Sequence, residues 1–188
     1  MDDKHQIRPR AGALLISEPH LDDFFFGRSV VLLADHGEEG SFGIILNKTV
    51  KVRFNDIVKD FPVFDAPLFL GGPVKTDTLF FIHTLGEEIR DSAPIMKGLY
   101  WGGRLEDVQE QILSGRLSTE QIRFFVGYAG WSPNQLDSEL EQHSWIVKDA
   151  SLHDVIHLNT ETMWQHYIRG MGKDYAIWSN YPANPILN

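Results

Sequence analysis

The stretch IRFFVGYAGWSPNQLDSEL, residues 122–140, decides how the rest of the chain can be arranged. Residues 122–128 are dense in aromatic and β-branched side chains, which is typical of a strand buried on both faces. Gly127, Ala129 and Gly130 then remove side-chain bulk, which predicts a tight and crowded turn with room for a neighbouring backbone or for Trp131 to fold back. A helix is expected to begin directly after this turn.

Capping chemistry marks the start of that helix. Ser132 can accept a bond from the free amides of the first turn, and Pro133 suits the first helical position because it has no N–H to leave unpaired. Gln135 can reach back to complete a capping box. The sequence therefore predicts a strand, a glycine turn and a capped helix in succession.

Four stretches of the chain together resemble the YqgE/AlgH family of bacterial proteins. They are FVGYAGWSPNQLDSE at 125–139, GALLISEPHLDDFFFGRSVVLLADHGEEGSFGIILNK at 12–48, LFLGGPV at 68–74 and YAIWSNYPANPILN at 175–188. They occur in the expected order and span almost the whole chain. The resemblance implies a compact domain with a mixed sheet. Some members are described as transcriptional regulators without an agreed mechanism, so the resemblance implies no defined activity.

Length and composition indicate one cytoplasmic domain. The 188 residues fit a single domain at 11–188, preceded by a flexible polar arm at 1–10. No apolar run approaches the roughly 20 residues of a membrane helix, and MDDKHQIRPR at the start lacks the apolar core of a secretory signal. The absence of cysteine excludes disulfides, thiolate metal sites and cysteine nucleophiles.

The net charge of −9 opposes direct binding to nucleic acid. No cluster of Lys and Arg occurs along the sequence to offset the repulsion from a phosphate backbone. If the chain is a regulator, we expect it to act through another protein. The predicted partner is therefore a protein or an unidentified small ligand, and neither a membrane nor DNA.

The remaining elements indicate an α+β (mixed α/β) class, with a mixed sheet flanked by short helices. Residues 35–40 have turn chemistry and predict an antiparallel hairpin with a loop longer than the tightest type, with His36 at its tip. The other predicted strands are 11–17, 28–34, 42–47, 68–70, 78–84, 95–101 and 145–147, and the other predicted helices are 53–60, 104–113 and 160–170. The prolines of 180–185 predict an irregular surface tail.

Reactive motifs are weak in this sequence. His153 and His157 are four residues apart with Asp154 between them, which resembles a zincin helix, but no third ligand is placed by the sequence. The plainer reading is a helix start with one histidine packed and one exposed. Gly71 and Gly72 precede no Gly-Lys-Ser/Thr, and no Gly-x-Ser-x-Gly occurs. We therefore predict no metal, no cofactor and no enzyme activity.

A candidate binding site is formed by motif residues that core packing does not obviously require. These are Asp23, Arg28, His36, Asn47, Gly71, Gly72, Pro73, Trp131, Gln135 and Glu139. Polar residues beside glycine turns at strand ends commonly hold ligands, so we hypothesise a shared groove for a small molecule or a partner peptide. Turns and caps that hold the sheet explain the same residues equally well.

The favoured function is a non-catalytic binding or regulatory protein. One alternative is a metal-dependent or small-molecule hydrolase that uses His36 or the pair of His153 and His157. A second alternative, direct DNA binding, follows from the family description and is opposed by the charge.

Overall fold

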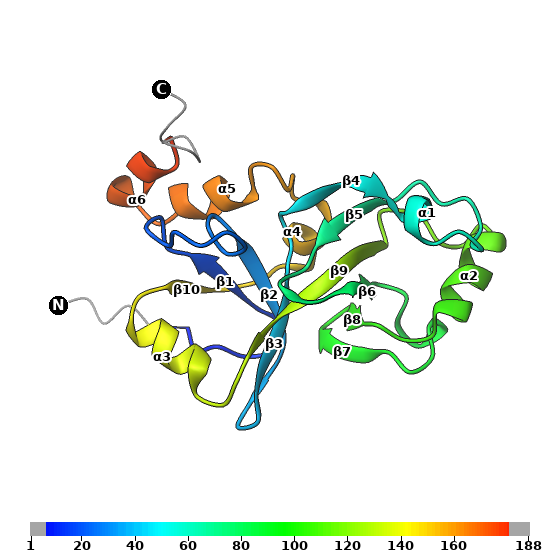
Figure 1. Cartoon of the computed structure of the whole chain (residues 1–188), viewed down its shortest axis with the longest axis horizontal. Coiled ribbons are helices and arrows are strands. Elements are labelled where there is room, and N and C mark those ends of the chain that lie inside the picture. The colour runs from blue at the N-terminus through cyan, green and yellow to red at the C-terminus, as the bar shows by residue number, and fades with distance from the viewer. Residues whose placement is uncertain (1–6, 181–188) are drawn as a thin grey trace.

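Ten strands and six helices make up the part of the chain, residues 7–180, that the computed structural model describes (Figure 1). The strands are β1 (Ala13–Ser17), β2 (Val30–Gly37), β3 (Gly40–Ile45), β4 (Thr49–Arg53), β5 (Pro67–Leu70), β6 (Val74–His83), β7 (Ala93–Met96), β8 (Leu99–Trp101), β9 (Ile122–Trp131) and β10 (Trp145–Asp149). The helices are α1 (Phe54–Ile57), α2 (Leu105–Leu113), α3 (Gln135–Glu141), α4 (Leu152–His157), α5 (Met163–Arg169) and α6 (Lys173–Trp178), with a 3₁₀ turn at Gly86–Glu88.

Strand β9 joins two halves of one sheet. The strand order is β10-β1-β2-β3-β9-β6-β8-β7, and β5 pairs with both β9 and β4. The first half of β9 lies between β5, at 124–126, and β6. The second half pairs with β3 at 129–131. Of the strand pairs in the described residues, β5 with β9 is the parallel one and the rest are antiparallel, so the fold is a strand-rich α+β fold.

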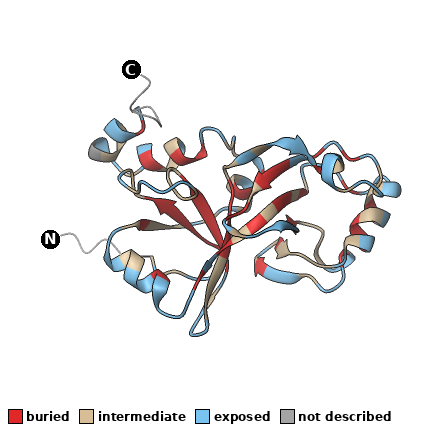
Figure 2. Cartoon of the chain, viewed as in Figure 1, coloured by how far each residue is buried: buried red, intermediate tan, exposed pale blue. Residues whose placement is uncertain are grey.

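Three buried clusters hold this sheet, and β9 contributes to each of them. The central cluster receives Phe125 of β9 and is covered by α4 and α5. The α2 cluster receives Phe124, and the α3 cluster receives Trp131. Buried residues are concentrated in β1, β2 and β9 (Figure 2). Because side chains alternate along a strand, apolar runs such as Leu14–Leu15–Ile16 supply two clusters at once.

The glycine turn that the sequence predicts after residue 126 is wrong, because β9 continues to Trp131. Gly127 has a φ of +72°, and a Cβ there would lie 2.4 Å from the carbonyl oxygen of Gly72. A Cβ on Gly71 would lie 2.2 Å from the oxygen of Gly127. The predicted room for a neighbouring backbone is confirmed at Gly127, although the chain does not reverse there.

The helix after β9 begins later than predicted. It starts at Gln135, after Asn134 in the left-handed region with a φ of +61°, so Ser132 is not its N-cap. The predicted reach of Gln135 is confirmed, because its Oε1 accepts a bond from the backbone N–H of Ser132 at 3.0 Å. Half of the capping box is therefore present.

The hairpin of β2 and β3 is tighter than the sequence predicts. Gly37 pairs directly with Gly40, so only Glu38 and Glu39 form the turn. His36 lies inside β2, opposite Ser41, rather than at the tip. The glycines at both ends let the strands extend to the turn itself.

Several other boundaries differ from the predictions. Residues 95–101 form parts of two strands, β7 and β8, because Lys97 and Gly98 make a turn between them. The predicted helix at 53–60 is limited to α1, and the exposed strand β4 precedes it. The predicted helix at 160–170 is limited to α5, and it is not the last, because a further helix, α6, follows it. Most of the predicted tail, 181–185, lies outside the described residues.

Candidate functional site

An open cleft of about 690 Å³ lies where β9 leaves β6. It is lined by Asp35, Glu39, Gly40, Ser41, Phe42, Val74, Lys75, Phe80, Trp101, Tyr128, Gly130, Trp131, Ser132 and Pro133. The volume lies within the roughly 300–1,000 Å³ that is usual for ligand sites. Residues from β2, β3, β6, β8 and β9 meet here, although they are far apart in the sequence.

Four half-buried rings form one wall of the cleft. The ring of Phe42 contacts Trp101 with centroids 5.3 Å apart and Tyr128 at 6.2 Å. Phe80 stacks on Trp101 at 5.6 Å and meets Tyr128 edge-on at 5.5 Å. We call Phe42, Phe80, Trp101 and Tyr128 the aromatic wall. Because each ring is only partly exposed and held by two others, the wall is a firm apolar surface.

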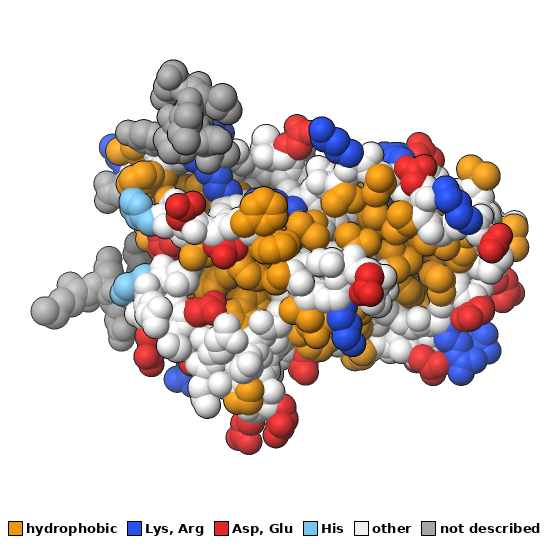
Figure 3. Space-filling model, in the orientation of Figure 1, with side chains coloured by type: hydrophobic (Ala, Val, Ile, Leu, Met, Phe, Trp, Pro, Cys, Tyr) orange, Lys and Arg blue, Asp and Glu red, His pale blue; other side chains and the backbone are white. Residues whose placement is uncertain are grey.

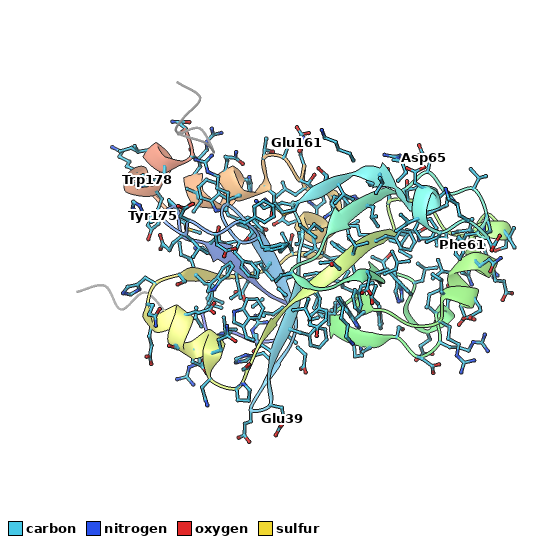
Figure 4. The ribbon with its side chains drawn as sticks, in the orientation of Figure 1. Glu39, Phe61, Asp65, Glu161, Tyr175 and Trp178 are labelled. Atoms are coloured by element: carbon cyan, nitrogen blue, oxygen red, sulfur yellow. The ribbon has the colours of Figure 1, made fainter. Side chains whose placement is uncertain are left out.

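Charged side chains line the cleft from two elements, the β2–β3 hairpin and β6. Asp35 and Glu39 line it from the β2–β3 hairpin, and Figure 4 shows Glu39 at the hairpin's end. Lys75 lines it from β6 and has a φ of +50°. Asp35 is opposite Phe42 in the hairpin, so both side chains project from the same face.

The predicted residues Trp131, Gln135 and Glu139 form a single network on the α3 side of the sheet. One carboxylate oxygen of Glu139 accepts the indole N–H of Trp131 and that of Trp145, each at 2.8 Å. The other oxygen accepts from the Gln135 amide at 2.9 Å. Trp131 and Trp145 are each 5 % exposed, so Glu139 supplies the acceptor for two indole N–H groups that water hardly reaches.

A second group of predicted residues organises the loop before β2. The Asp23 carboxylate accepts the backbone N–H groups of Phe25 and Phe26, each at 2.8 Å. The Asn47 side chain accepts from Val30 N–H and donates to the Arg28 carbonyl at 2.9 Å. The Arg28 guanidinium lies 5.1 Å from the ring of Trp164, and burial lowers its pKa. These contacts fix the loop to β2 and α5.

Lys48 adds a second cation to this loop. Its ammonium donates to the Gly27 carbonyl at 2.7 Å. Burial and the neighbouring Arg28 lower the pKa of Lys48, and Asp23 partly offsets that shift. No motif in the sequence marks Lys48, because its environment is created by the loop folding over it.

His36 forms a cross-strand pair with Ser41, with 2.7 Å between Nδ1 and Oγ. A Ser–His contact beside a cleft suggests a nucleophile and its base. However, residues alternate across a strand, so His36 and Ser41 project from the face opposite to Asp35 and Phe42. No third side chain among residues 7–180 binds His36 to orient its ring. This geometry is an ordinary cross-strand hydrogen bond.

Gly71, Gly72 and Pro73 pass across β9. The Gly71 N–H donates to the Val126 carbonyl at 2.9 Å, and the Gly71 carbonyl accepts from Ile45 N–H at 2.8 Å. Both glycines are buried, so the segment presents its backbone to the sheet. The ten predicted site residues therefore lie in four places rather than along one groove, and Trp131 is the one that lines the cleft. Their role in binding stays a prediction.

The histidine pair on α4 is not packed as the plainer reading predicts. Both His153 and His157 are exposed, with ring centroids 5.3 Å apart. Within the described part of the chain, no group of three or more His, Cys, Asp or Glu side chains is placed to hold a metal ion. In the same part of the chain, no helix has the length and apolar character to cross a membrane.

Sequence reasoning missed the aromatic wall and Lys75. Phe42, Phe80, Trp101 and Tyr128 have the composition of ordinary strand residues, and only the sheet order brings them together. No spacing in the sequence distinguishes them from core aromatics.

Comparison with known proteins places this architecture in a family. The AlgH-like family profile matches residues 14–176. A UPF0301 protein from Cytophaga hutchinsonii is 47 % identical over 178 residues, which cover 94 % of this chain and 98 % of that protein. A UPF0301 protein from Bacteroides thetaiotaomicron is 43 % identical and covers 98 % of this chain and 94 % of its own.

Two solved structures share the fold. The solution structure of AlgH from Pseudomonas aeruginosa has a TM-score of 0.73 and 24 % identity, covering 94 % of this chain and 97 % of that one. A crystal structure of a Corynebacterium diphtheriae protein has a TM-score of 0.75 and 22 % identity, covering 96 % and 95 %. The profile and the close relatives span nearly the whole chain. The chain therefore belongs to the AlgH-like family, which confirms the resemblance of its motifs to the YqgE/AlgH family.

Proposed function

We propose that this chain is a non-catalytic binding module that acts in the cytoplasm through the cleft beside the aromatic wall. The observation that carries the proposal is the meeting of four half-buried rings in an open cleft of about 690 Å³. Half-exposed aromatic surface of this kind gains free energy when a ligand covers it. Leaving these rings partly in water costs free energy. A binding role explains why the chain keeps them partly exposed.

The chemistry of the lining supports binding rather than catalysis. The lining residues include two carboxylates, Asp35 and Glu39, and one ammonium, Lys75, with no histidine or cysteine among them. Ser41 is already bonded to His36. A regulatory role, if the chain has one, would then follow from what the cleft binds.

A fragment screen tests this proposal. Small aromatic and aliphatic compounds are added to the full chain, and the indole N–H signals of the five tryptophans are followed by NMR. We expect the largest shifts at Trp101, with much smaller shifts at Trp178 on α6. Trp101→Leu keeps the wall apolar but removes its largest ring, so it should weaken binding.

Phe24→Ala is the matched control, because Phe24 is an aromatic residue that is 88 % exposed and outside the cleft lining. It should leave fragment binding unchanged. Fragments that bind Trp101→Leu as well as the wild type, or that bind only elsewhere, would refute the cleft as the binding site.

A further inference from the structure

The last residues of β9 have a strand partner on one edge only. On the β3 side, Ser41, Phe42 and Gly43 pair with Trp131, Gly130 and Ala129. On the other side, Leu79–His83 of β6 pair with residues 122–126 of β9. The one further pair between these strands joins Val74 to Tyr128. Within the described chain, 129–131 have no strand on that edge.

The edge is open because β6 begins at Val74, opposite Tyr128, and Gly71 and Gly72 before it contact residues 126–128 of β9 instead of following 129–131. Further along β6, residues 75–78 form an arch, because they stand opposite Gly127 alone and are all exposed. Lys75 adopts a φ of +50°, which turns the strand away from β9. The cleft is lined by Val74 and Lys75 of β6 and by Gly130 and Trp131 of β9, so the unpaired strand edge lies beside the aromatic wall.

We propose that the cleft binds an extended segment of a partner protein, which adds as a strand along residues 129–131 of β9. An open edge offers backbone hydrogen bonds to such a segment, and pockets beside it select alternate side chains. This inference rests on the proposed function and names its ligand. An aromatic or branched apolar side chain of the segment lies on the aromatic wall.

Charge indicates which segment fits. Asp35 and Glu39 line the cleft from the β2–β3 hairpin and Lys75 lines it from β6, so carboxylates outnumber the one ammonium. The whole chain carries a net charge of −9, which attracts a basic partner at long range. The segment therefore has alternating apolar residues and a Lys or Arg that lies near Asp35 and Glu39.

The rings themselves favour a side chain over a free planar molecule. Their centroids are 5.3 to 6.2 Å apart, so each ring already contacts its neighbours and no slot remains open between them. Such a surface suits a side chain laid across it. The strand edge then supplies the affinity that one side chain lacks.

A random heptapeptide display library, selected on the full chain, tests the proposal. Clones that also bind Trp101→Leu are removed. We expect a consensus of alternating apolar residues with a basic residue at one end. A synthetic consensus peptide should lose about tenfold or more in affinity when alternate backbone amides on one edge are N-methylated, because one lost hydrogen bond is worth about that factor. Methylating the amides of the opposite edge should change little.

The charge is tested with Asp35→Asn combined with Glu39→Gln. This pair should weaken binding of the basic peptide by roughly three- to tenfold at low salt, and less at high salt. Glu87→Gln combined with Glu88→Gln is the control, because it removes two exposed carboxylates outside the cleft lining.

The outcomes separate the two proposals. Fragments that bind in the cleft while the library gives no consensus would overturn the strand addition and leave the binding module standing. A peptide that binds equally well whichever edge is methylated would overturn it too. If neither fragments nor peptides bind at the cleft, both proposals fail.

Discussion

Glu139 shows how one residue can satisfy several buried donors. Its carboxylate accepts both indoles of Trp131 and Trp145 and ties α3 to the sheet through Gln135. The motif that marks the family in sequence is therefore a hydrogen-bonded unit in the structure.

Replacing Glu139 by alanine should destabilise the protein. Two nearly buried indole N–H groups would lose their acceptor, at about 1–3 kcal/mol each, so we expect the free energy of unfolding to fall by about 2–6 kcal/mol. Urea denaturation followed by tryptophan fluorescence measures this loss. Glu141→Ala, on the exposed face of the same helix, should change stability by less than about 0.5 kcal/mol. Equal effects of the two substitutions would rule out the indole contacts as the cause.

Position 71 requires glycine because another part of the backbone lies close to it, and not because of its own φ. A Cβ there would lie 2.2 Å from the Gly127 oxygen, although the φ of Gly71 is not in the left-handed region. Gly71→Ala should therefore cost roughly 3 kcal/mol or more, since β5 and β9 must separate. Gly37→Ala is the control, because a Cβ there meets nothing within 4 Å and its φ is ordinary. Thermal unfolding of both variants gives the comparison, and a stable Gly71→Ala would contradict the close approach.

At the scale of elements, an ion pair and hydrogen bonds between Asp107 and Arg90 join α2 to the turn before β7. The Asp107 carboxylate accepts the backbone N–H of Arg90 at 2.8 Å and Nε at 2.9 Å, and it also pairs with Nη2. The hydrogen bonds from the Arg90 side chain and backbone lower the pKa of Asp107 to about 2.

This low pKa predicts a specific acid sensitivity. Because the folded pKa lies below the ordinary value of 3.8, the unfolded chain takes up the proton first, and stability is lost as pH falls from about 4 towards 2. Asp107→Asn should be less stable at pH 7 and lose less of its remaining stability between pH 5 and pH 3. Urea midpoints across that range test this. Asp137→Asn, exposed on α3, should keep the wild-type slope.

The elements also show how far sequence reasoning reaches. Buried strands such as β1 and β5, and the amphipathic helix α2, were predicted because their patterns are local. The end of β9 was not, because Gly127 lies against the backbone of Gly72 and Val74, which arrives from a distant part of the sequence. Strand β4 was missed because it is mostly exposed and polar. The cleft was missed because its rings come from separate strands.

For the whole molecule, charge decides the kind of partner. Figure 3 shows Lys and Arg side chains dispersed among acidic ones on the face drawn, with the net charge at −9. We expect no mobility shift of duplex DNA at micromolar protein in 50 mM salt. A shift that weakens steeply with added salt would show a phosphate-binding surface and overturn this expectation.

Cooperativity is the second property of the whole molecule, and β9 should govern it. The α2 cluster contains no tryptophan among its buried and packed residues, whereas Trp131, Trp145 and Trp164 lie in the other two clusters. Phe124 belongs to the α2 cluster, with its ring 4.1 Å from that of Phe54.

Phe124→Ala should cost about 3–5 kcal/mol. Because Phe124 and Phe125 are consecutive residues of one strand, losing the α2 cluster should loosen the central cluster as well. The tryptophan signal should then shift to lower urea by the same amount as far-UV circular dichroism, in one transition. A tryptophan transition that stays at its wild-type midpoint while circular dichroism becomes biphasic would show that the two halves of the sheet unfold independently.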